Sequence, residues 1–480
     1  MQNSYELYIF HFLLLALKRI HLFDILLDGV FCLKTGGRKE VYMTILIKNG
    51  RVINPSEKMD KVLDVYVKDG VIVEKGENIE KEADKVIDAK GCFVMPGLID
   101  LHVHFRDPGL TYKEDIITGS MAAANGGFTS VCCMPNTKPV TDNAEVVRYI
   151  INKGKEAGYT NVLPVGSVTK GMAGKQITDV FELKEAGVCA ISEDGKSVMD
   201  SNVYRDAMKN AVKADVPVLA HCEDINLVNG GVMNMGDKSE EFGVKGISNA
   251  VEDIIVARDI LLAKETGAKL HLCHCSTKDS VTMVKKAKED GVKVTAEVCP
   301  HHFAMSTDDM DSADANYKMN PPLRTREDVD ALIKGLSEDV MDVIATDHAP
   351  HSAEEKARSI TEAPFGIVGL ETAVPLTVTH LLKPGFIRSE EHTSELQSHT
   401  RMAEKMSYNP AKVLGIDKGS LDEGKVADIT IINPDEEYII DVNEFKSKGR
   451  NTPFGGTKVS GKVKWTILGG KIVKEPEEER

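Results

Sequence analysis

Residues 94–109 read VMPGLIDLHVHFRDPG. The apolar run leads into His102 and His104, which places both histidines near the end of a buried strand. Side chains two positions apart on a strand point to the same face, so the two imidazoles can converge. Paired imidazoles are suited to a divalent metal such as zinc. A lone His-x-His pair is more often two unrelated histidines, so the interpretation depends on the rest of the chain.

From residue 99 to residue 347 the sequence alternates short apolar runs with longer helix-like stretches. This alternation is typical of a parallel sheet whose faces are covered by helices. Eight successive units predict a closed (β/α)8 barrel of the TIM type, and the paired histidines add the expectation that the barrel is metal-dependent. The strand candidates span residues 99–104, 128–134, 162–168, 188–192, 216–221, 270–274, 293–298 and 341–345.

The two ends of the chain differ from the barrel segment, residues 94–417. Residues 43–93 and 418–480 contain short strand-like runs separated by glycine turns. Isolated β arms of this size bury too little surface to be stable. We therefore expect both ends to pair into one small β-sandwich domain beside the barrel, with two unrelated β arms as the alternative.

Two segments match neither the barrel pattern nor the β-domain pattern. The apolar run at 8–17 has no preceding basic residue and no cleavage site after it, and it is too short to span a bilayer. We expect residues 1–42 to be a non-native upstream extension and Met43 to be the true start. Residues 388–399 resemble the translation of a DNA-sequencing adapter. We treat them as an adapter-derived insert and do not count His392 or His399 as ligands.

The composition limits the classes of function. A chain of 480 residues with 42% hydrophobic and 28% charged residues is ordinary for a globular protein with a large core. The net charge of −15 argues against nucleic acid and anionic membranes as partners. Nine cysteines, mostly in apolar runs, indicate buried thiols in a reducing cytoplasm rather than disulfides. We assign Cys273 and Cys275 to packing.

Chemically capable side chains follow nearly every predicted strand. In a barrel of this type, the C-terminal ends of the strands face the active site. Chance rarely places four histidines and two aspartates on one rim. The candidate metal ligands are His102, His104, Asp194, His221, His274 and Asp347.

The residue types suggest a division of roles. The two histidines of the first strand and Asp347 would hold one metal. The histidines of the fifth and sixth strands would hold a second, with Asp194 as the bridge. This ligand mixture favours zinc, although manganese or cobalt could substitute. Metal-activated water would hydrolyse an amide C–N bond, and Asp347 is placed to carry the proton to the leaving nitrogen.

Several motifs together carry a family resemblance. The stretch 100–109 and the stretch ATDHAPH at 345–351, followed by Lys356, resemble the amidohydrolase superfamily and within it the longer bacterial (class I) dihydroorotase family. MPNT at 134–137 and NPPLR at 320–324 also fit that family. The resemblance extends from about residue 43 to the C-terminus and leaves out residues 388–399.

The resemblance implies the reversible conversion of N-carbamoyl-L-aspartate to L-dihydroorotate plus water, the third step of pyrimidine biosynthesis. It implies one or two Zn2+ per subunit. The implied substrate contacts are Arg106, Asn136 and His351 for the carboxylate, and Asn320, Phe365 and Gly366 for the ring. A guanidinium, an amide and an imidazole agree with an anionic ligand. On position alone, Asn320 before proline is equally well explained as a turn residue.

One departure from the wider superfamily narrows the interpretation. Many relatives bridge their metals with a carboxylated lysine, whereas the fourth strand ends in SEDG at 192–195. An aspartate bridge argues against dihydropyrimidinase and hydantoinase, whose substrates also lack a carboxylate. The alternatives are another cyclic amidase, such as an allantoinase, or a non-catalytic scaffold for aspartate transcarbamoylase. We expect a cytoplasmic enzyme with a small-molecule substrate; a homodimer and an association with aspartate transcarbamoylase both stay open.

Overall fold

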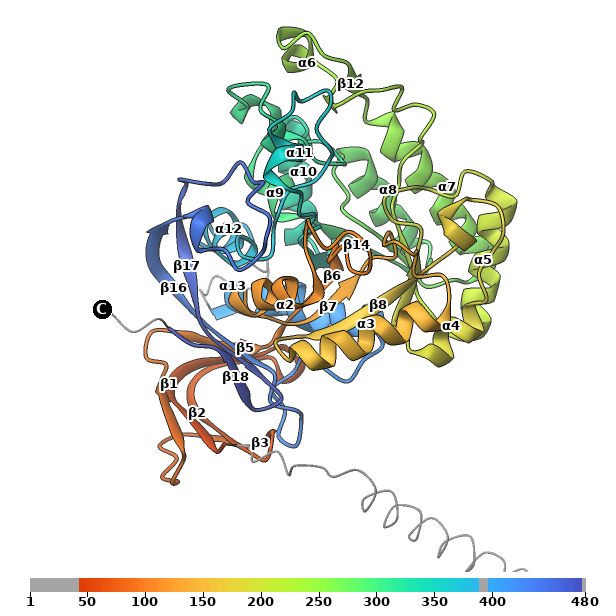
Figure 1. The fold of residues 1–480 in the computed structure, drawn as a ribbon. Helices are drawn as coiled ribbons and strands as arrows, with labels where there is room; N and C mark the ends of the chain where they lie inside the picture. Colours follow the sequence, from red (N-terminus) through yellow and green to blue (C-terminus); the bar gives the residue numbers. More distant parts are fainter. Residues whose placement is uncertain (1–42, 388–395, 477–480) are drawn as a thin grey trace, which may run out of the picture. The chain divides into compact units, whose positions relative to one another are not determined.

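The computed structural model describes residues 43–387 and 396–476. The predictions for residues 1–42 and 388–395, including His392, lie outside these residues. The described part of the chain forms a parallel barrel and a β domain (Figure 1). No helix in this part is both long and apolar enough to cross a membrane.

All eight predicted barrel strands are present, and each overlaps its predicted range. They pair in parallel in the order β15-β14-β13-β10-β9-β8-β7-β6. Their bounds are β6 Leu98–Val103, β7 Phe128–Cys133, β8 Asn161–Ser167, β9 Ala190–Ser192, β10 Val218–Ala220, β13 Leu270–Leu272, β14 Val294–Val298 and β15 Val343–Ile344. The predicted α/β barrel is therefore confirmed.

The barrel closes where β6 meets the segment after β15. Val103 and His348 form a parallel bridge, and the His104 N–H donates to the His348 carbonyl at 2.8 Å. The buried Asp100 carboxylate accepts from the Thr346 N–H at 3.1 Å and from its hydroxyl at 2.6 Å. This side chain thus substitutes for ladder hydrogen bonds and ties the first strand to the last.

Helices follow the barrel strands, and several of them begin at polar side-chain caps. The side chains of Asn143, Asp179 and Asp200 accept the first free N–H groups of α3, α4 and α5. The main helices are α2 Ile116–Asn125, α3 Ala144–Ala157, α4 Val180–Ala186, α5 Ser201–Ala214, α7 Ala250–Thr266, α8 Lys278–Glu289, α10 Arg326–Ser337 and α12 Ala373–Thr377. Shorter elements are β11 Met233–Asn234, α6 Asp237–Glu241, β12 Gly246–Ile247, α9 Pro300–Ala304, α11 Ala353–Lys356, α13 Leu396–Ala403 and α14 Asn409–Leu414.

The barrel strands and the residues directly after them contribute to two different cores. Leu101 and Cys273 belong to a cluster of side chains contributed by many barrel strands, which fills the barrel interior. Val103 and Cys275 belong to a larger cluster shared with the covering helices. Burial on both faces explains why these strands read as continuous apolar runs. Both cysteines are buried in these clusters, as the packing assignment expects.

Strands from both ends of the described chain pair in one sheet and form a β domain. Its sheet has the order β18-β17-β16-β5-β1-β2-β3, with β4 on β1, and β5 pairs antiparallel with β16. The bounds are β1 Ile45–Asn54, β2 Met59–Lys68, β3 Val71–Gly76, β4 Lys85–Asp88, β5 Phe93–Pro96, β16 Ile429–Ile439, β17 Lys458–Leu468 and β18 Lys471–Lys474. Buried residues from both ends, such as Ile47 and Ile431, share its core. His399 contacts Phe93 and Asp60 of this domain.

Candidate metal centre and active site

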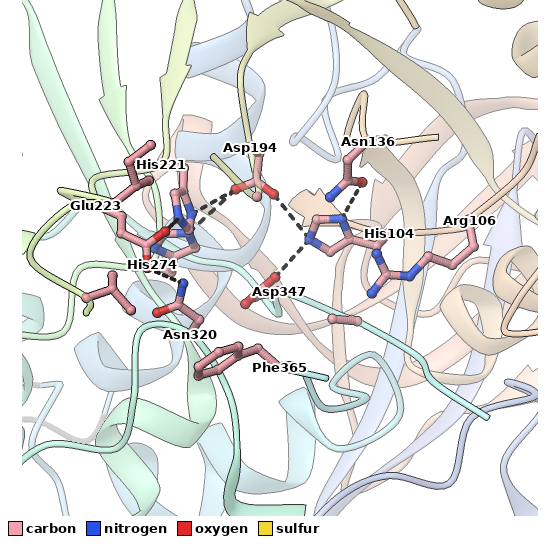
Figure 2. A pocket seen from close by; sticks show the side chains of 15 residues that line it. His104, Arg106, Asn136, Asp194, His221, Glu223, His274, Asn320, Asp347 and Phe365 are labelled. Carbon is pink, nitrogen blue, oxygen red and sulfur yellow. Dashed lines mark hydrogen bonds and ion pairs between the residues drawn. The ribbon is translucent and has the colours of Figure 1, made fainter. Parts of the chain in front are cut away.

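A cavity of about 380 Å3 lies at the C-terminal ends of the barrel strands (Figure 2). Most of the site residues predicted from the sequence line it: His104, Arg106, Asn136, Asp194, His221, His274, Asn320, Asp347, Phe365 and Gly366. His102 and His351 are not lining residues, but both are buried in contact with residues that are. The topology therefore brings the whole predicted set to one place.

Asp194 lies between His104 on one side and His221 and His274 on the other (Figure 2). Its Oδ2 lies 3.3 Å from His104 Nε2, and its Oδ1 lies 3.1 Å from His102 Nε2. The same Oδ1 lies 3.3 Å from His221 Nδ1 and 3.6 Å from His274 Nε2. A carboxylate in this position can contact two neighbouring cations at once.

Asp347 completes the group around the first strand. Its Oδ1 lies 3.1 Å from His104 Nε2 and 3.5 Å from His102 Nε2. One ligand atom from each of these three residues lies within 4.8 Å of the others, and His102, Asp194 and His274 form a second group by the same measure. Both groups have the size and residue types of a metal site.

Two atoms in this cluster test whether the residues fit a metal. His102 Nε2 and Asp194 Oδ1 are buried and lack a hydrogen-bond partner among the described residues. Buried polar atoms are normally paired, and a cation at their common focus would satisfy both. Imidazole nitrogens and carboxylate oxygens are ligands for zinc and related divalent ions. The donor set therefore fits a divalent metal.

The charges in the cluster depend on one another. Burial disfavours the charged form of His102, but the adjoining Asp194 and Asp347 outweigh burial and raise the pKa of His102 well above its ordinary value. Burial would likewise raise the pKa of both carboxyl groups, but His102 holds each below its usual range. A cation would take the place of this proton, so metal binding is expected to weaken as pH falls.

Glu297, in β14, is a residue that the sequence motifs did not reveal. Its carboxylate accepts from His102 Nδ1 at 2.9 Å, from His271 Nε2 at 3.0 Å and from the His274 N–H at 3.1 Å. Because the carboxylate holds the Nδ1 proton of His102, the Nε2 lone pair faces the cluster. The available signal was a single acidic residue inside an otherwise uncharged, buried strand.

Asn136 and Glu223 contact the candidate ligands from the cavity side. Asn136 Oδ1 accepts from His104 Nδ1 at 2.9 Å. Glu223 Oε2 lies 3.3 Å from His221 Nε2, and its Oε1 accepts from Asn320 Nδ2 at 2.8 Å. Asn320 thus lines the cavity through its amide group and is more than a turn residue. Glu223, which was not among the predicted site residues, also lines the cavity.

Arg106 brings a buried positive charge to the cavity wall. Its Nε donates to the Pro350 carbonyl at 3.3 Å, and burial lowers its pKa to about 10, which leaves the guanidinium charged near neutral pH. The His351 ring is already engaged on both sides. Its Nε2 donates to the Phe365 carbonyl at 2.8 Å, and its Nδ1 accepts from Lys113 Nζ at 3.2 Å. Arg106 therefore faces the cavity directly, whereas the His351 ring packs beside it, with Nε2 3.4 Å from Arg106 Nη2, and holds the Phe365 carbonyl.

Comparison with known proteins identifies the family of the chain. The model of the dihydro-orotase-like family matches residues 91–280. A dihydroorotase of Acetivibrio thermocellus is 48% identical over 429 residues, covering 89% of this chain and 98% of that protein. A dihydroorotase of Bacillus cereus is 47% identical over 435 residues, covering 91% of this chain and 99% of that protein.

Solved structures show the same fold. The L-hydantoinase (dihydropyrimidinase) of Arthrobacter aurescens superposes with a TM-score of 0.78 at 26% identity, covering 91% of this chain and 97% of that one. The D-hydantoinase of a Thermus species gives a TM-score of 0.75 at 26% identity, covering 90% and 95%. The two dihydroorotases share 48% and 47% of their residues with this chain, whereas these two hydantoinases share 26%. From its sequence relatives, its barrel and its His/Asp cluster, the chain belongs to the dihydroorotase family.

Proposed function

We propose that this chain catalyses the reversible conversion of N-carbamoyl-L-aspartate to L-dihydroorotate plus water, the third step of de novo pyrimidine biosynthesis, with Zn2+ at one or both metal positions. One observation carries the proposal: the Arg106 guanidinium and the His/Asp cluster share one cavity of about 380 Å3. A cation beside a metal centre suits a cyclic amide that also carries a carboxylate. Dihydroorotate has both groups.

The substrate carboxylate is assigned to Arg106 and Asn136, with His351 packed beside Arg106. The ring is assigned to Asn320 and to the backbone at Phe365 and Gly366. These contacts place the scissile amide over the cluster and would exclude bulk water from it. Such positioning lowers the barrier because the reacting groups are already held in contact.

The transfer of the proton is assigned to Asp347. When bound, zinc would polarise the amide carbonyl and lower the pKa of a neighbouring water. The Asp347 carboxylate takes a proton from the attacking water and delivers it to the ring nitrogen as the C–N bond breaks. In the cyclisation direction it takes the proton from the ureido nitrogen, and water leaves from the carboxyl carbon. Asp347 lines the cavity, so its carboxylate can reach the substrate in either direction of the reaction.

The test is turnover of dihydroorotate and of carbamoyl-aspartate by the zinc-loaded chain, beside the variant Asp347→Asn. Asp342→Asn is the matched control, because Asp342 bonds Lys288 and is not a cavity residue. We expect turnover in the parent and the control and a loss of at least about 100-fold in Asp347→Asn. Hydrolysis of dihydrouracil or hydantoin in preference to dihydroorotate would favour a hydantoinase-like activity. Bound zinc without any turnover would favour the scaffold role.

Other proposals rest on the resemblance and not on the site. We propose that the enzyme is cytoplasmic. We also propose that it forms a homodimer and associates with aspartate transcarbamoylase. Light scattering of the chain alone and mixed with that enzyme tests the two proposals about assembly. We also retain Met43 as the start and residues 388–399 as an insert. Mass spectrometry of the native N-terminus and resequencing of the locus test these two proposals.

A further inference from the structure

The loop at residues 363–366 forms part of the cavity wall through Phe365 and Gly366. Gly366 has a φ of +128°, and a Cβ there would lie 2.7 Å from the Ala349 Cβ and 3.0 Å from the Ala349 carbonyl oxygen. The backbone of the loop therefore packs directly against the segment that follows the last barrel strand. Its position depends on backbone contacts, so the groups that bind its carbonyls control it.

Lys356, the last residue of α11, is one such group. Its side chain is buried, and Nζ donates to the carbonyls of Lys318 at 3.2 Å, Pro364 at 3.2 Å and Gly366 at 3.0 Å. An ammonium group has three N–H donors, and each one finds a carbonyl here. The lysine thus fastens three backbone positions to one point.

Asn451, from the segment between β16 and β17, is the second group. Its Nδ2 donates to the Gly366 carbonyl at 3.0 Å and to the Ala349 carbonyl at 3.1 Å, while its Oδ1 accepts the His351 N–H at 3.1 Å. The side chain is buried, and both its amide nitrogen and its amide oxygen are hydrogen-bonded. Gly366 therefore receives one donor from Lys356 and one from Asn451, which matches the two lone pairs of a carbonyl oxygen.

We propose that Lys356 and Asn451 are paired positioning residues that hold the backbone of Phe365 and Gly366 at the cavity wall and thereby set the affinity for substrate. The proposal rests on the proposed function, because it assigns substrate contact to this loop. Neither residue lines the cavity, and in the described part of the chain the side chains of both residues bond backbone groups rather than candidate metal ligands. Their loss should therefore affect binding more than the metal or the proton transfer.

The test compares Lys356→Met and Asn451→Asp with two matched controls. Lys405→Met removes another buried lysine, whose Nζ bonds Asp339 and the Met341 carbonyl, and Asn409→Asp removes an amide that bonds the Asp342 carbonyl. We expect each test variant to raise KM for dihydroorotate about tenfold, with kcat within about threefold and zinc content unchanged. The controls should change neither constant. If Lys356→Met does not fold, Asn451→Asp carries the test.

The double variant Lys356→Met/Asn451→Asp sharpens the test, because both residues act on one carbonyl. Its rise in KM should be smaller than the product of the two single effects, whereas Lys356→Met/Asn409→Asp should give the product. Hydrogen exchange of a peptide covering residues 360–368 supplies a readout without substrate. It should be faster in the test variants and unchanged in the controls.

The outcomes separate this proposal from the proposed function. Faster exchange in the test variants of a chain that does not turn over dihydroorotate would refute the proposed substrate while supporting the positioning role. Unchanged KM and unchanged exchange would overturn the positioning role. A parallel loss of kcat and zinc would also overturn it, because that result would mean that the pair supports the metal centre.

Discussion

Replacement of Glu297 by glutamine should weaken zinc binding without unfolding the protein. The carboxylate accepts three hydrogen bonds, from His102 Nδ1, His271 Nε2 and the His274 N–H, and it is fully buried. Burial would raise the pKa of Glu297, but the hydrogen bonds and charges of His102 and His271 outweigh it and lower the pKa to about 2. The group is therefore ionised at neutral pH, and its bonds are charge-assisted.

The magnitude follows from the loss of that charge. A hydrogen bond to a charged group contributes about 1.5–3 kcal/mol and a neutral one about 1 kcal/mol, so Glu297→Gln should lose roughly 0.5–2 kcal/mol at His102. Glutamine keeps the shape and one acceptor, and His271 can change tautomer to accept from the new amide. Since 1.4 kcal/mol is a factor of ten, zinc affinity should fall about tenfold, within the range measured for residues that support metal ligands.

The assay is competition for zinc between the protein and a chromogenic chelator, with melting of the metal-depleted forms measured in parallel. Glu252→Gln is the control, because Glu252 is also a buried carboxylate but bonds the Ser276 N–H and pairs with Arg324. We expect weaker zinc binding only in Glu297→Gln, at similar melting temperatures. Equal zinc affinity in the two variants would refute the reasoning that Glu297 orients the His102 ring.

Two further predictions concern the loop and its surroundings. Gly366→Ala should raise KM and destabilise the fold by about 1–3 kcal/mol, because φ is +128° and the new Cβ would meet Ala349 at 2.7 Å. Gly291→Ala, at φ +75° with no atom within 4 Å, should lower the melting temperature less and leave KM unchanged. At Glu355, burial raises the pKa, but hydrogen bonds and the charge of Lys113 outweigh it and lower the pKa to about 2 from 4.5. This stabilisation is present above pH 4.5 and is lost as pH falls toward 2, so the gap in unfolding free energy between the parent and Glu355→Gln should narrow over that interval. Denaturant titrations at pH 5 and pH 2.5 check this, and a constant gap would contradict it.

Most of the barrel could be predicted because its signals are local. A strand buried on both faces is an apolar run a few residues long, and each of the eight runs became a strand. Strand ends were less predictable. The fifth strand is Val218–Ala220, shorter than the predicted 216–221, because hydrogen bonding to the neighbouring strands sets where a strand ends.

The candidate metal ligands were predictable for a related reason. His102 and His104 share the end of the first strand, the other four follow four different strands, and a parallel barrel brings all its C-terminal strand ends to one rim. A residue such as Asp194 could therefore be placed near His221 without knowing a single distance. The sequence also indicated that its two ends belong together, since neither end contains enough apolar residues for a domain of its own.

The order of the barrel strands, the association of the two ends and the residue types on the rim could thus be predicted from local patterns. Tertiary structure alone decided which polar groups satisfy one another. Glu297 meets His102 across 195 residues of sequence, and Asn451 meets Gly366 across 85. No local pattern encodes such pairs, because a buried donor takes whichever acceptor the packed chain brings within about 3 Å. That choice fixes the metal-facing nitrogen of His102 and the position of the cavity wall.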